Sequence, residues 1–488
     1  LEFSLIIAFV LNNTKAMIKL NSKQGFGLKP NAVDYSPYAV HLLGPRPDLS
    51  IRSRLSFRLV KQDVLQMGRN SFVINDPDYR YAVLLAFDAF RLEERVVPIH
   101  LNDIFDMDLE IRRSSPGLPW MPMYKTKGEV MDCSSARNSI RWFWHNVKKQ
   151  VRVYPHDTRV LYRSHFMEDG EPKIRAVYGY PATMTFGEAQ FALPLIKAFK
   201  NVNTPIAYGY DMISGGAMRL RREINKYKFF NCVDFRRFDK TVSKQLIVIA
   251  FSILEQNINF TKYQDHGVPD GRRLYRSWEF LQEYFVHTLV RLPNGDRFQK
   301  KAGIPSGSYF TQLIGSVVNY IILTYASIKL TGRPPQYIKV FGDDSVFATH
   351  EKLDLYDLAR FIDSIGMEIN LKKSIITEKV DEIEFLGFCI AGGFPHRALD
   401  KWLTSLYCPE YPDSCIDDFQ SRALGLAYAN HGIEPTFDAI CRAIITCSPF
   451  EVMISRDFGR YLLNIGVDPS SLSRNLPTRR EFMFSLIR

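Results

Sequence analysis

Several patterns that identify common classes of protein are missing from this sequence. Its seven cysteines are scattered, and they form neither a Cys-x-x-Cys pair nor the spacing of a zinc site. A scattered, odd-numbered set of cysteines indicates reduced thiols in an intracellular setting. The ten histidines are also dispersed and complete no Ser/His/Asp or zinc arrangement. No internal repeat or low-complexity tract is present, which excludes a repeat protein.

Long hydrophobic runs are also missing. No segment has 18 consecutive apolar residues, the length typical of a membrane-spanning helix. Residues 1–11 are apolar, but they are too short to span a bilayer and lack the basic start and cleavage site of a signal peptide. The first methionine is Met17. We therefore interpret residues 1–16 as a truncated or upstream-translated start, or as a strand added to the core. The chain is expected to be soluble.

Acidic residues are fewer than basic residues in this chain. Against 63 Lys and Arg stand 52 Asp and Glu, a net charge of +11, and 46% of the 488 residues are hydrophobic. The chain can bury a large core, and its positive excess favours polyanions as partners. Basic and aromatic residues alternate through 137–165. This is typical of a channel that follows a nucleic-acid strand, but an amphipathic helix with inward aromatics explains Trp142 and Trp144 equally well.

The most informative segment is Phe341-Gly342-Asp343-Asp344-Ser345. β-Branched and aromatic residues flank it on both sides, and Gly-Asp-Asp is typical of a turn, so we predict a β-hairpin with an acidic tip. Neighbouring carboxylates at such a tip repel each other and favour a bound cation. Two Mg²⁺ ions about 4 Å apart are the usual arrangement for transfer at phosphorus. An exposed turn without function is the alternative.

A second acidic strand supports the first. Residues 226–234 are mostly apolar and end in Asp234, and after the next turn the apolar spacing becomes helical, from Leu246 to Ile253. A strand that ends in a carboxylate can lie beside the acidic hairpin, so that Asp234 and Asp343 share metal ions. Asp239 lies five residues further on, where it can reach a sugar hydroxyl. The alternative is a buried strand followed by a helix-capping Asp.

Between these segments, a loop precedes a long apolar stretch. Residues 303–312 contain a Pro/Ser/Gly turn, and the residues from Leu313 to Ala326 have helical apolar spacing. Backbone N–H groups and hydroxyls at the start of a helix suit phosphate or ribose contacts. Many helices begin in this way, so the loop alone is weak evidence of function.

Together these segments resemble motifs A, B and C of the viral RNA-directed RNA polymerases: Asp-x4-Asp, then Ser-Gly-x3-Thr on a helix, then Gly-Asp-Asp. The sequences of these segments are most similar to those of partitivirus-like polymerases of small double-stranded RNA viruses, within the picornavirus-like supergroup. The resemblance covers residues 114–397. Further segments resemble motif G at the template entrance (114–120), the basic motif F (171–181), the lysine of motif D (370–374) and the motif E hairpin (385–388).

The resemblance implies catalytic roles for the acidic residues. Asp234 and Asp343 match the two metal-binding positions, and Asp344 matches the auxiliary carboxylate beside them. All three are therefore expected to be metal ligands and part of the catalytic centre. Asp239 matches the residue that senses the ribose 2′-OH, the group that distinguishes RNA from DNA precursors.

The resemblance also implies roles for basic residues. Lys173 and Arg175 match cations that hold the incoming triphosphate and screen charge during phosphoryl transfer. Lys373 matches the general acid that protonates the leaving pyrophosphate, although the adjacent Lys372 could point inward instead.

The remaining matches are loop and helix positions. Many relatives place Asn four residues after the motif B Thr; here Gly315 stands at that distance, and the next Asn is one turn further on. The nucleotide- and ribose-binding set is completed by Ser306, Gly307, Thr311 and Asn319, and the template entrance by Ser115, Pro116 and Gly117.

The implied architecture is an α+β right-hand polymerase with fingers, thumb and an antiparallel palm sheet. The expected divisions are an N-terminal extension with part of the fingers (1–113), fingers (114–225), palm with motif A (226–255), a fingers insertion (256–300), palm with motifs B to E (301–398) and thumb (399–488).

The implied function is template-directed RNA synthesis from NTPs for viral genome replication and transcription. Two Mg²⁺ ions, with Mn²⁺ as an alternative, would be the cofactors. RNA template, RNA product and NTPs are the expected partners, with a viral capsid protein as a further one. The expected location is the host cytoplasm, within a virion or replication complex, without a membrane. A reverse transcriptase and a non-catalytic RNA-binding or capsid-associated protein are the alternatives.

Overall fold

The structure, a computed structural model, describes residues 17–28, 34–168, 170–464 and 466–486, so the segment 1–16 lies outside the described residues. Its strands are β1 (Met17–Leu20), β2 (Thr158–Ser164), β3 (Ile174–Gly179), β4 (Phe229–Val233), β5 (Phe235–Arg236), β6 (Leu289–Arg291), β7 (Arg297–Lys300), β8 (Tyr337–Phe341), β9 (Asp344–Thr349), β10 (Glu368–Ile369), β11 (Ile375–Thr377), β12 (Glu384–Phe385) and β13 (Phe388–Cys389). Its α-helices are α2 (Pro37–Leu43), α3 (Phe57–Leu65), α4 (Pro77–Ala89), α5 (Leu101–Asp106), α6 (Lys127–Asp132), α7 (Ser134–Lys148), α8 (Ala182–Asn201), α9 (Gly216–Ile224), α10 (Phe238–Thr241), α11 (Lys244–Glu255), α12 (Gly271–Val286), α13 (Thr311–Thr331), α14 (Leu355–Ser364), α15 (Leu399–Tyr407), α16 (Ile416–Asn430), α17 (Pro435–Thr446), α18 (Arg456–Asn464) and α19 (Arg479–Ser485).

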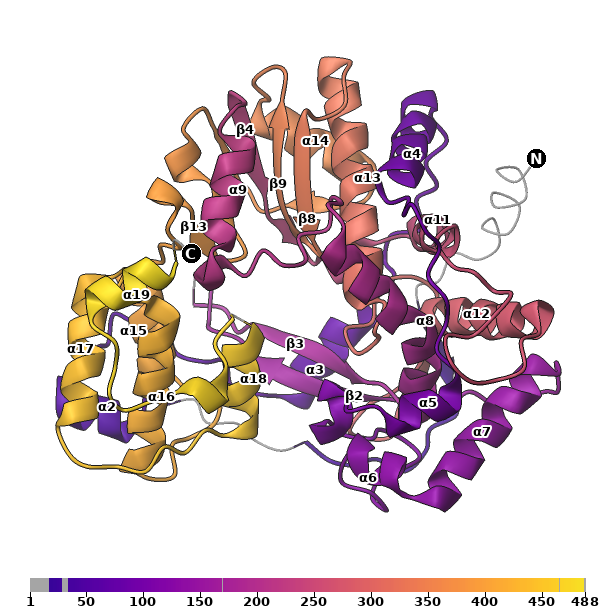
Figure 1. The fold of residues 1–488 in the computed structure, drawn as a ribbon, viewed down its shortest axis with the longest axis horizontal. Helices are drawn as coiled ribbons and strands as arrows, with labels where there is room; N and C mark the ends of the chain where they lie inside the picture. The colour runs from indigo at the N-terminus through magenta and orange to yellow at the C-terminus, as the bar shows by residue number, and fades with distance from the viewer. Residues whose placement is uncertain (1–16, 29–33, 169, 465, 487–488) are drawn as a thin grey trace.

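Two sheets organise the molecule, which confirms the predicted α+β class. The central sheet has the order β11-β4-β9-β8, and all its neighbouring strands are antiparallel. The N-terminal sheet has the order β1-β7-β6-β2-β3, and its β2–β6 pair is parallel. In Figure 1, α9, α13 and α14 lie beside the central sheet at the top of the view.

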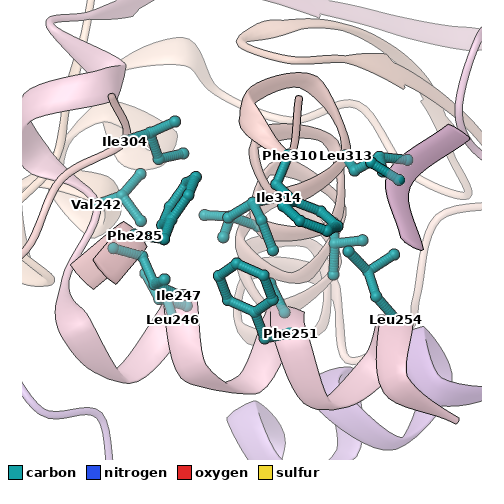
Figure 2. Packing of buried hydrophobic residues seen from close by; sticks show 14 of the residues in the cluster. Val242, Leu246, Ile247, Phe251, Leu254, Phe285, Ile304, Phe310, Leu313 and Ile314 are labelled. Atoms are coloured by element: carbon teal, nitrogen blue, oxygen red, sulfur yellow. The ribbon is translucent and has the colours of Figure 1, made fainter. Parts of the chain in front are cut away.

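The core between α11 and α13 supports the central sheet. Phe251 of α11 contacts Phe285 and Phe310 edge-on, with ring centroids 5.1 and 5.3 Å apart. Figure 2 shows Leu246, Phe251 and Leu254 directed toward Leu313 and Ile314 at the start of α13. Because these side chains are fully or almost fully buried, their transfer out of water stabilises the packing of α13.

Helix α13 is apolar on nearly every side. Among the described residues it is the helix long and apolar enough to cross a membrane by length and composition, and 83% of its most apolar window is buried within the protein. A helix that is hydrophobic all round belongs in the interior of a large domain. It begins two residues before the predicted start and ends five residues after the predicted end.

The sequence left open whether Trp142 and Trp144 of α7 line a nucleic-acid channel or face inward from an amphipathic helix, and the structure separates the two residues. Trp144 is buried, and its indole N–H donates to the carbonyl of Thr183 at 2.9 Å. Trp142 points the other way, with 66% of its surface exposed. The helix is therefore amphipathic, and Trp142 stays available for a partner.

The C-terminal bundle, α15–α19, forms a separate group at the lower left of Figure 1, and α2 from the N-terminal part of the chain packs on it. Ser36 donates to Asp413 at 2.5 Å, and Tyr38 stacks on Phe419. A second contact joins the bundle's 408–415 segment to the N-terminal sheet. There Arg163 of β2 pairs with Glu410 at 2.8 Å. Ser214 Oγ also donates to the carbonyl of Gly466, between α18 and α19, at 3.4 Å. The bundle is thus joined to several segments of the N-terminal half.

Candidate active site

The acidic hairpin forms as predicted. β8 and β9 are joined by a two-residue turn, because Phe341 pairs directly with Asp344. Gly342 has a φ of +65°, which glycine adopts without strain. A Cβ at this position would lie 2.9 Å from the side-chain amide nitrogen of Gln312, which can move aside, so it is the backbone conformation that favours glycine here.

Asp234 lies beside this hairpin. β4 pairs with β9, and the register ends with Val233 opposite Ser345. One further step along the same register places Asp234 opposite Asp344. The backbone of Asp234 is held by its neighbours: its N–H donates to Ser374 Oγ at 3.0 Å, and its carbonyl accepts from the N–H of Asn370 at 2.7 Å. The predicted strand is confirmed, although it begins at Phe229.

The carboxylates interact electrostatically. Burial first, and then the charges of Asp343 and Asp234, raise the pKa of Asp344 to about 7. Burial and Asp234 also raise the pKa of Asp343, against the opposing effect of Arg175. Asp343 and Asp344 are nevertheless exposed to solvent. Protein atoms therefore surround these carboxylates closely, while their surfaces stay accessible to small molecules.

Asp239 belongs to the same set. Burial raises its pKa, and the charges of Lys240, Asp63, Arg175 and Asp343 all act on it. It lies on the short helix α10, next to Arg237, whose φ of +53° is uncommon for a residue with a side chain. We call Asp234, Asp239, Asp343 and Asp344 the carboxylate cluster.

Oxygen ligands of this kind suit a hard cation such as Mg²⁺. Among the described residues, no group of three or more His, Cys, Asp and Glu side chains is arranged to hold a metal ion. Mg²⁺ commonly takes one or two carboxylates and completes its shell with water and substrate phosphates. Burial first, and then the charges of neighbouring carboxylates, raise the pKa values of Asp343 and Asp344, and a divalent cation would offset both effects by stabilising the charged forms. The residues therefore fit such an ion.

The loop before α13 packs against β3. Ser306 is exposed, and its Oγ accepts from the N–H of Tyr178 at 3.3 Å. A Cβ on Gly307 would lie 1.7 Å from the carbonyl oxygen of Tyr178, so only glycine fits at this approach. The hydroxyl of Thr311 lies 2.6 Å from the carbonyl oxygen of Pro305 and closes the loop on itself. These contacts hold the loop against β3, and the side chain of Ser306 faces solvent.

The structure places Asn319 beneath the hairpin turn. It is fully buried, and its amide donates to the carbonyls of Gly342 at 2.9 Å and Asp344 at 3.3 Å. Gly315, where many relatives carry Asn, packs so closely that a Cβ would lie 3.3 Å from the Cα of Gly342. These contacts give Asn319 a supporting position under the turn, and its ribose contact stays a prediction.

Two predicted lysines meet at a residue that the sequence analysis missed. Nζ of Lys173 and Nζ of Lys373 lie 2.7 and 2.9 Å from the same oxygen of Glu168. Hydrogen bonding from Lys173 is the largest cause of a pKa near 2 for Glu168. Arg175, two residues from Lys173, acts electrostatically on Asp343 and Asp239. The structure therefore brings the basic residues of two distant segments to one place.

The template-entrance residues lie against α8. Pro116 accepts from the N–H of Ala182 at 2.7 Å, and Lys127 donates to the carbonyl of Ser115 at 2.7 Å. Pro116 and Gly117 are buried, and a Cβ on Gly117 would lie 2.8 Å from the carbonyl oxygen of Tyr180. Pro116 and Gly117 therefore anchor this predicted template-entrance loop against the protein, and Ser115 is its more accessible residue.

Two further buried acids escaped the sequence analysis. Asp63 of α3 pairs with Lys240, beside Asp239, and accepts from the N–H of Ala176, beside Arg175, at 2.7 Å. Glu188 of α8 binds the loop before α13. Neither belongs to a recognisable motif, so the sequence carried no signal for them beyond an acidic residue in an apolar stretch.

Comparison with known proteins gives a consistent result. A sequence model of the family "Viral RNA-dependent RNA polymerase" matches residues 93–437. The RNA-directed RNA polymerase of Atkinsonella hypoxylon virus (isolate 2H) is 29% identical over 336 residues, 59% of this chain and 50% of that protein. That of Cryptosporidium parvum virus 1 (strain KSU-1) is 26% identical over 353 residues, 65% of this chain and 62% of that protein.

The chain therefore spans about half to three-fifths of the length of these relatives. Among solved structures, the Sicinivirus 3Dpol RNA-dependent RNA polymerase superposes with a TM-score of 0.70 at 14% identity. The match covers 97% of this chain and 100% of that one. At this identity the likeness shows the fold, which is the predicted right-hand architecture.

Proposed function

Because the chain belongs to the viral RNA-dependent RNA polymerase family, we propose that it extends an RNA 3′ end with NTPs, directed by an RNA template. The observation that carries this proposal is the convergence of Asp234, Asp343 and Asp344 from two neighbouring strands, where burial, and then the charge of Asp234, raise the pKa of both Asp343 and Asp344. In the same proposal, the central sheet belongs to the palm, the N-terminal sheet to the fingers and the C-terminal bundle to the thumb, with the divisions predicted above.

The carboxylate cluster would hold the metal ions. Asp234 and Asp343 would be ligands, with Asp344 beside them. When bound, two Mg²⁺ ions would lower the pKa of the attacking hydroxyl and stabilise the leaving pyrophosphate. The Asp234 N–H donates to Ser374 Oγ and the Asp234 carbonyl accepts from the N–H of Asn370, and these bonds hold the residue at the hairpin. Its carboxylate therefore needs little reorganisation on metal binding.

Nucleotide selection would rest on the neighbouring polar groups. Asp239 lies close enough to Asp343 for their charges to interact, so it would reach the ribose of a nucleotide bound at the cluster. Ser306 and Thr311 would line the same side. Lys173 and Arg175 would bind the triphosphate, and Lys373 would donate a proton to pyrophosphate as it leaves. A carboxylate that hydrogen-bonds the 2′-OH favours NTPs over dNTPs.

The proposal extends to the biological setting. The chain would replicate and transcribe a viral RNA genome in the host cytoplasm, within a virion or replication complex, and its membership of the polymerase family supports this proposal. A capsid protein would be a further partner.

Primer extension on an RNA template tests the assignment. The wild-type chain should incorporate NTPs in the presence of Mg²⁺, and Asp343→Ala should lower the rate at least about 10²-fold, the scale of one lost transition-state contact. Asp381→Ala, at an exposed acid outside the cluster, is the matched control. Full activity of Asp343→Ala would contradict the proposal. Preference for dNTPs would indicate a reverse transcriptase, and RNA binding without synthesis would indicate a non-catalytic protein.

A further inference from the structure

Helix α8 carries a buried acid that the proposed chemistry does not use. Glu188 is fully buried in the middle of an apolar helix. One of its carboxyl oxygens accepts from Ser308 Oγ at 2.7 Å, and the other accepts from the backbone N–H of Tyr309 at 2.8 Å. Burial of a carboxyl group is costly unless its hydrogen bonds are made. Both of its oxygens are committed to one loop.

That loop is the one that presents Ser306. Ser308 and Tyr309 follow Ser306 directly, and they come just before Thr311, the first residue of α13. Another contact of the loop is with Tyr178 of β3, which binds Ser306 and crowds Gly307. Phe310, the last residue before α13, packs on Phe251 and Trp278. The loop is therefore held by β3, by Glu188 and by the core around Phe310.

Helix α8 is itself fixed in place. Trp144 lies so close to Gly187 that a Cβ there would be 1.9 Å from the indole ring, and its N–H donates to the carbonyl of Thr183. The first turn of α8 also holds the template-entrance loop, through Ala182 and Thr183. One rigid helix thus contacts the template-entrance loop at its start and the Ser306 loop two turns later.

We propose that Glu188 is a positioning residue for nucleotide selection. It holds the Ser306–Thr311 loop in the position from which the loop can contact the ribose of the incoming nucleotide. The inference rests on the proposed polymerase function. Glu188 is covered by protein and touches no substrate, so it acts through Ser308 and Tyr309. Its loss would let the loop move, which would weaken nucleotide binding and reduce the preference for NTPs over dNTPs.

The charge state of Glu188 agrees with this position. Burial raises its pKa to about 8, against the lowering effects of Ser308, Tyr309 and Lys127. Its other polar neighbours are phenols, at Tyr180, Tyr284 and Tyr309, whose own pKa values are raised. The acid is therefore largely protonated at neutral pH. Both oxygens accept in the ionised form, whereas in the protonated form one oxygen can donate to Ser308 Oγ while the other accepts from Tyr309, and a glutamine has the same shape and a similar bonding capacity.

The experiment compares three variants in primer extension with both NTPs and dNTPs. Glu188→Ala should raise the KM for NTPs about tenfold, the equivalent of one lost hydrogen bond, and lower the NTP/dNTP preference by a similar factor. Glu188→Gln should stay within about twofold of wild type in both quantities, because its oxygen can accept from Tyr309 and its amide can donate to Ser308. Ser308→Ala should shift both quantities in the same direction as Glu188→Ala, by less.

Glu255→Ala is the matched control. Glu255 is also a largely covered acid with a raised pKa, and it accepts from Trp278 at 2.8 Å and Tyr275 at 3.3 Å, both of them on α12. Its loss should lower thermal stability and leave the KM and the NTP/dNTP preference unchanged.

The outcomes separate the two proposals. If the wild-type chain makes no RNA, the polymerase assignment fails. If it makes RNA, and Glu188→Ala lowers stability as Glu255→Ala does without a change in KM or sugar preference, then Glu188 is only structural and the inference is overturned. If Glu188→Ala does not fold, the inference depends on Ser308→Ala, whose unchanged KM and preference would overturn it.

Discussion

Lys173 and Lys373 lie within hydrogen-bonding distance of a single oxygen atom, Oε1 of Glu168, at 2.7 and 2.9 Å. The two lysines come from segments that are 200 positions apart in the chain. Under the proposed function Lys173 binds the triphosphate and Lys373 protonates the leaving pyrophosphate, so Glu168 would compete with phosphate oxygens for both lysines.

The first prediction concerns this shared carboxylate. Glu168→Gln should lower the KM for NTPs by two- to fivefold, because the lysines would no longer have to release the Glu168 carboxylate before they contact the nucleotide phosphates. A single exposed ion pair is worth up to about 1 kcal/mol. Steady-state primer extension measures the effect. Glu171→Gln removes the same charge from the same exposed loop and should leave KM unchanged. An increased KM in Glu168→Gln would show that Glu168 orients the lysines instead.

A second prediction follows from the raised pKa of Asp344. The folded state binds the Asp344 proton more tightly than the unfolded chain, so its contribution to stability is present at low pH and is lost as pH rises toward 7. In metal-free buffer at pH 8, Asp344→Asn should therefore raise Tm, on the order of 2 °C. At pH 4 the difference should vanish.

Mg²⁺ should act on the same repulsion. At pH 8 it should raise the Tm of wild type more than that of Asp344→Asn, since an ion that binds the folded state stabilises it. Differential scanning fluorimetry with and without EDTA provides the measurement. Equal Mg²⁺ shifts in both proteins would mean that the ion does not bind near Asp344.

The third prediction concerns the support beneath the hairpin. Asn319→Ala leaves the carbonyls of Gly342 and Asp344 without their buried donor. The free energy of unfolding should fall by about 1–3 kcal/mol, and RNA synthesis should fall with it at temperatures where the protein is still folded. Urea unfolding and primer extension report the two effects.

Ser327→Ala provides the comparison on the same helix. The Ser327 hydroxyl donates to the carbonyl of Arg333 at 2.8 Å, at the far end of α13. Its loss should change stability slightly and synthesis not at all. If Asn319→Ala loses stability but keeps wild-type synthesis, the amide has no role in placing the carboxylates.

The fourth prediction concerns the contact between the N-terminal sheet and the C-terminal bundle. Arg163→Glu should break the pair with Glu410 and repel it, while Tm changes little because the Arg163 side chain is half exposed. Under the proposed function this contact joins the fingers to the thumb around the RNA, so RNA should dissociate faster from the variant. Arg163→Glu combined with Glu410→Arg should restore slow dissociation.

Arg360→Glu is the control for this charge reversal. Arg360 pairs with Asp357 within α14, so its reversal alters the net charge equally without touching the closure. RNA dissociation from a fluorescent template at two salt concentrations distinguishes the two variants. Identical dissociation from both would mean that net charge, and not closure, retains the RNA.

The sequence alone determined the local structures of this protein. The hairpin at Asp343, the strand before Asp234 and the helix after Thr311 depend on turn residues and apolar periodicity within a few positions, and the structure contains all three. The family motifs also predicted the right-hand fold. The sequence could not separate Trp142 from Trp144, because both lie in one short helix and only the position of its neighbours selects the buried face.

Only the tertiary structure decided which side chains meet. Glu188 and Ser308 are 120 positions apart, and Glu168 and Lys373 are 205 apart. No local pattern encodes such a pair, because partner choice depends on how separately formed helices and strands pack together. The burial that raises the pKa of Glu188 and Asp344 has the same origin. The local sequence therefore determines which reactive side chains this protein has, and the packing of distant segments determines their contacts and pKa values.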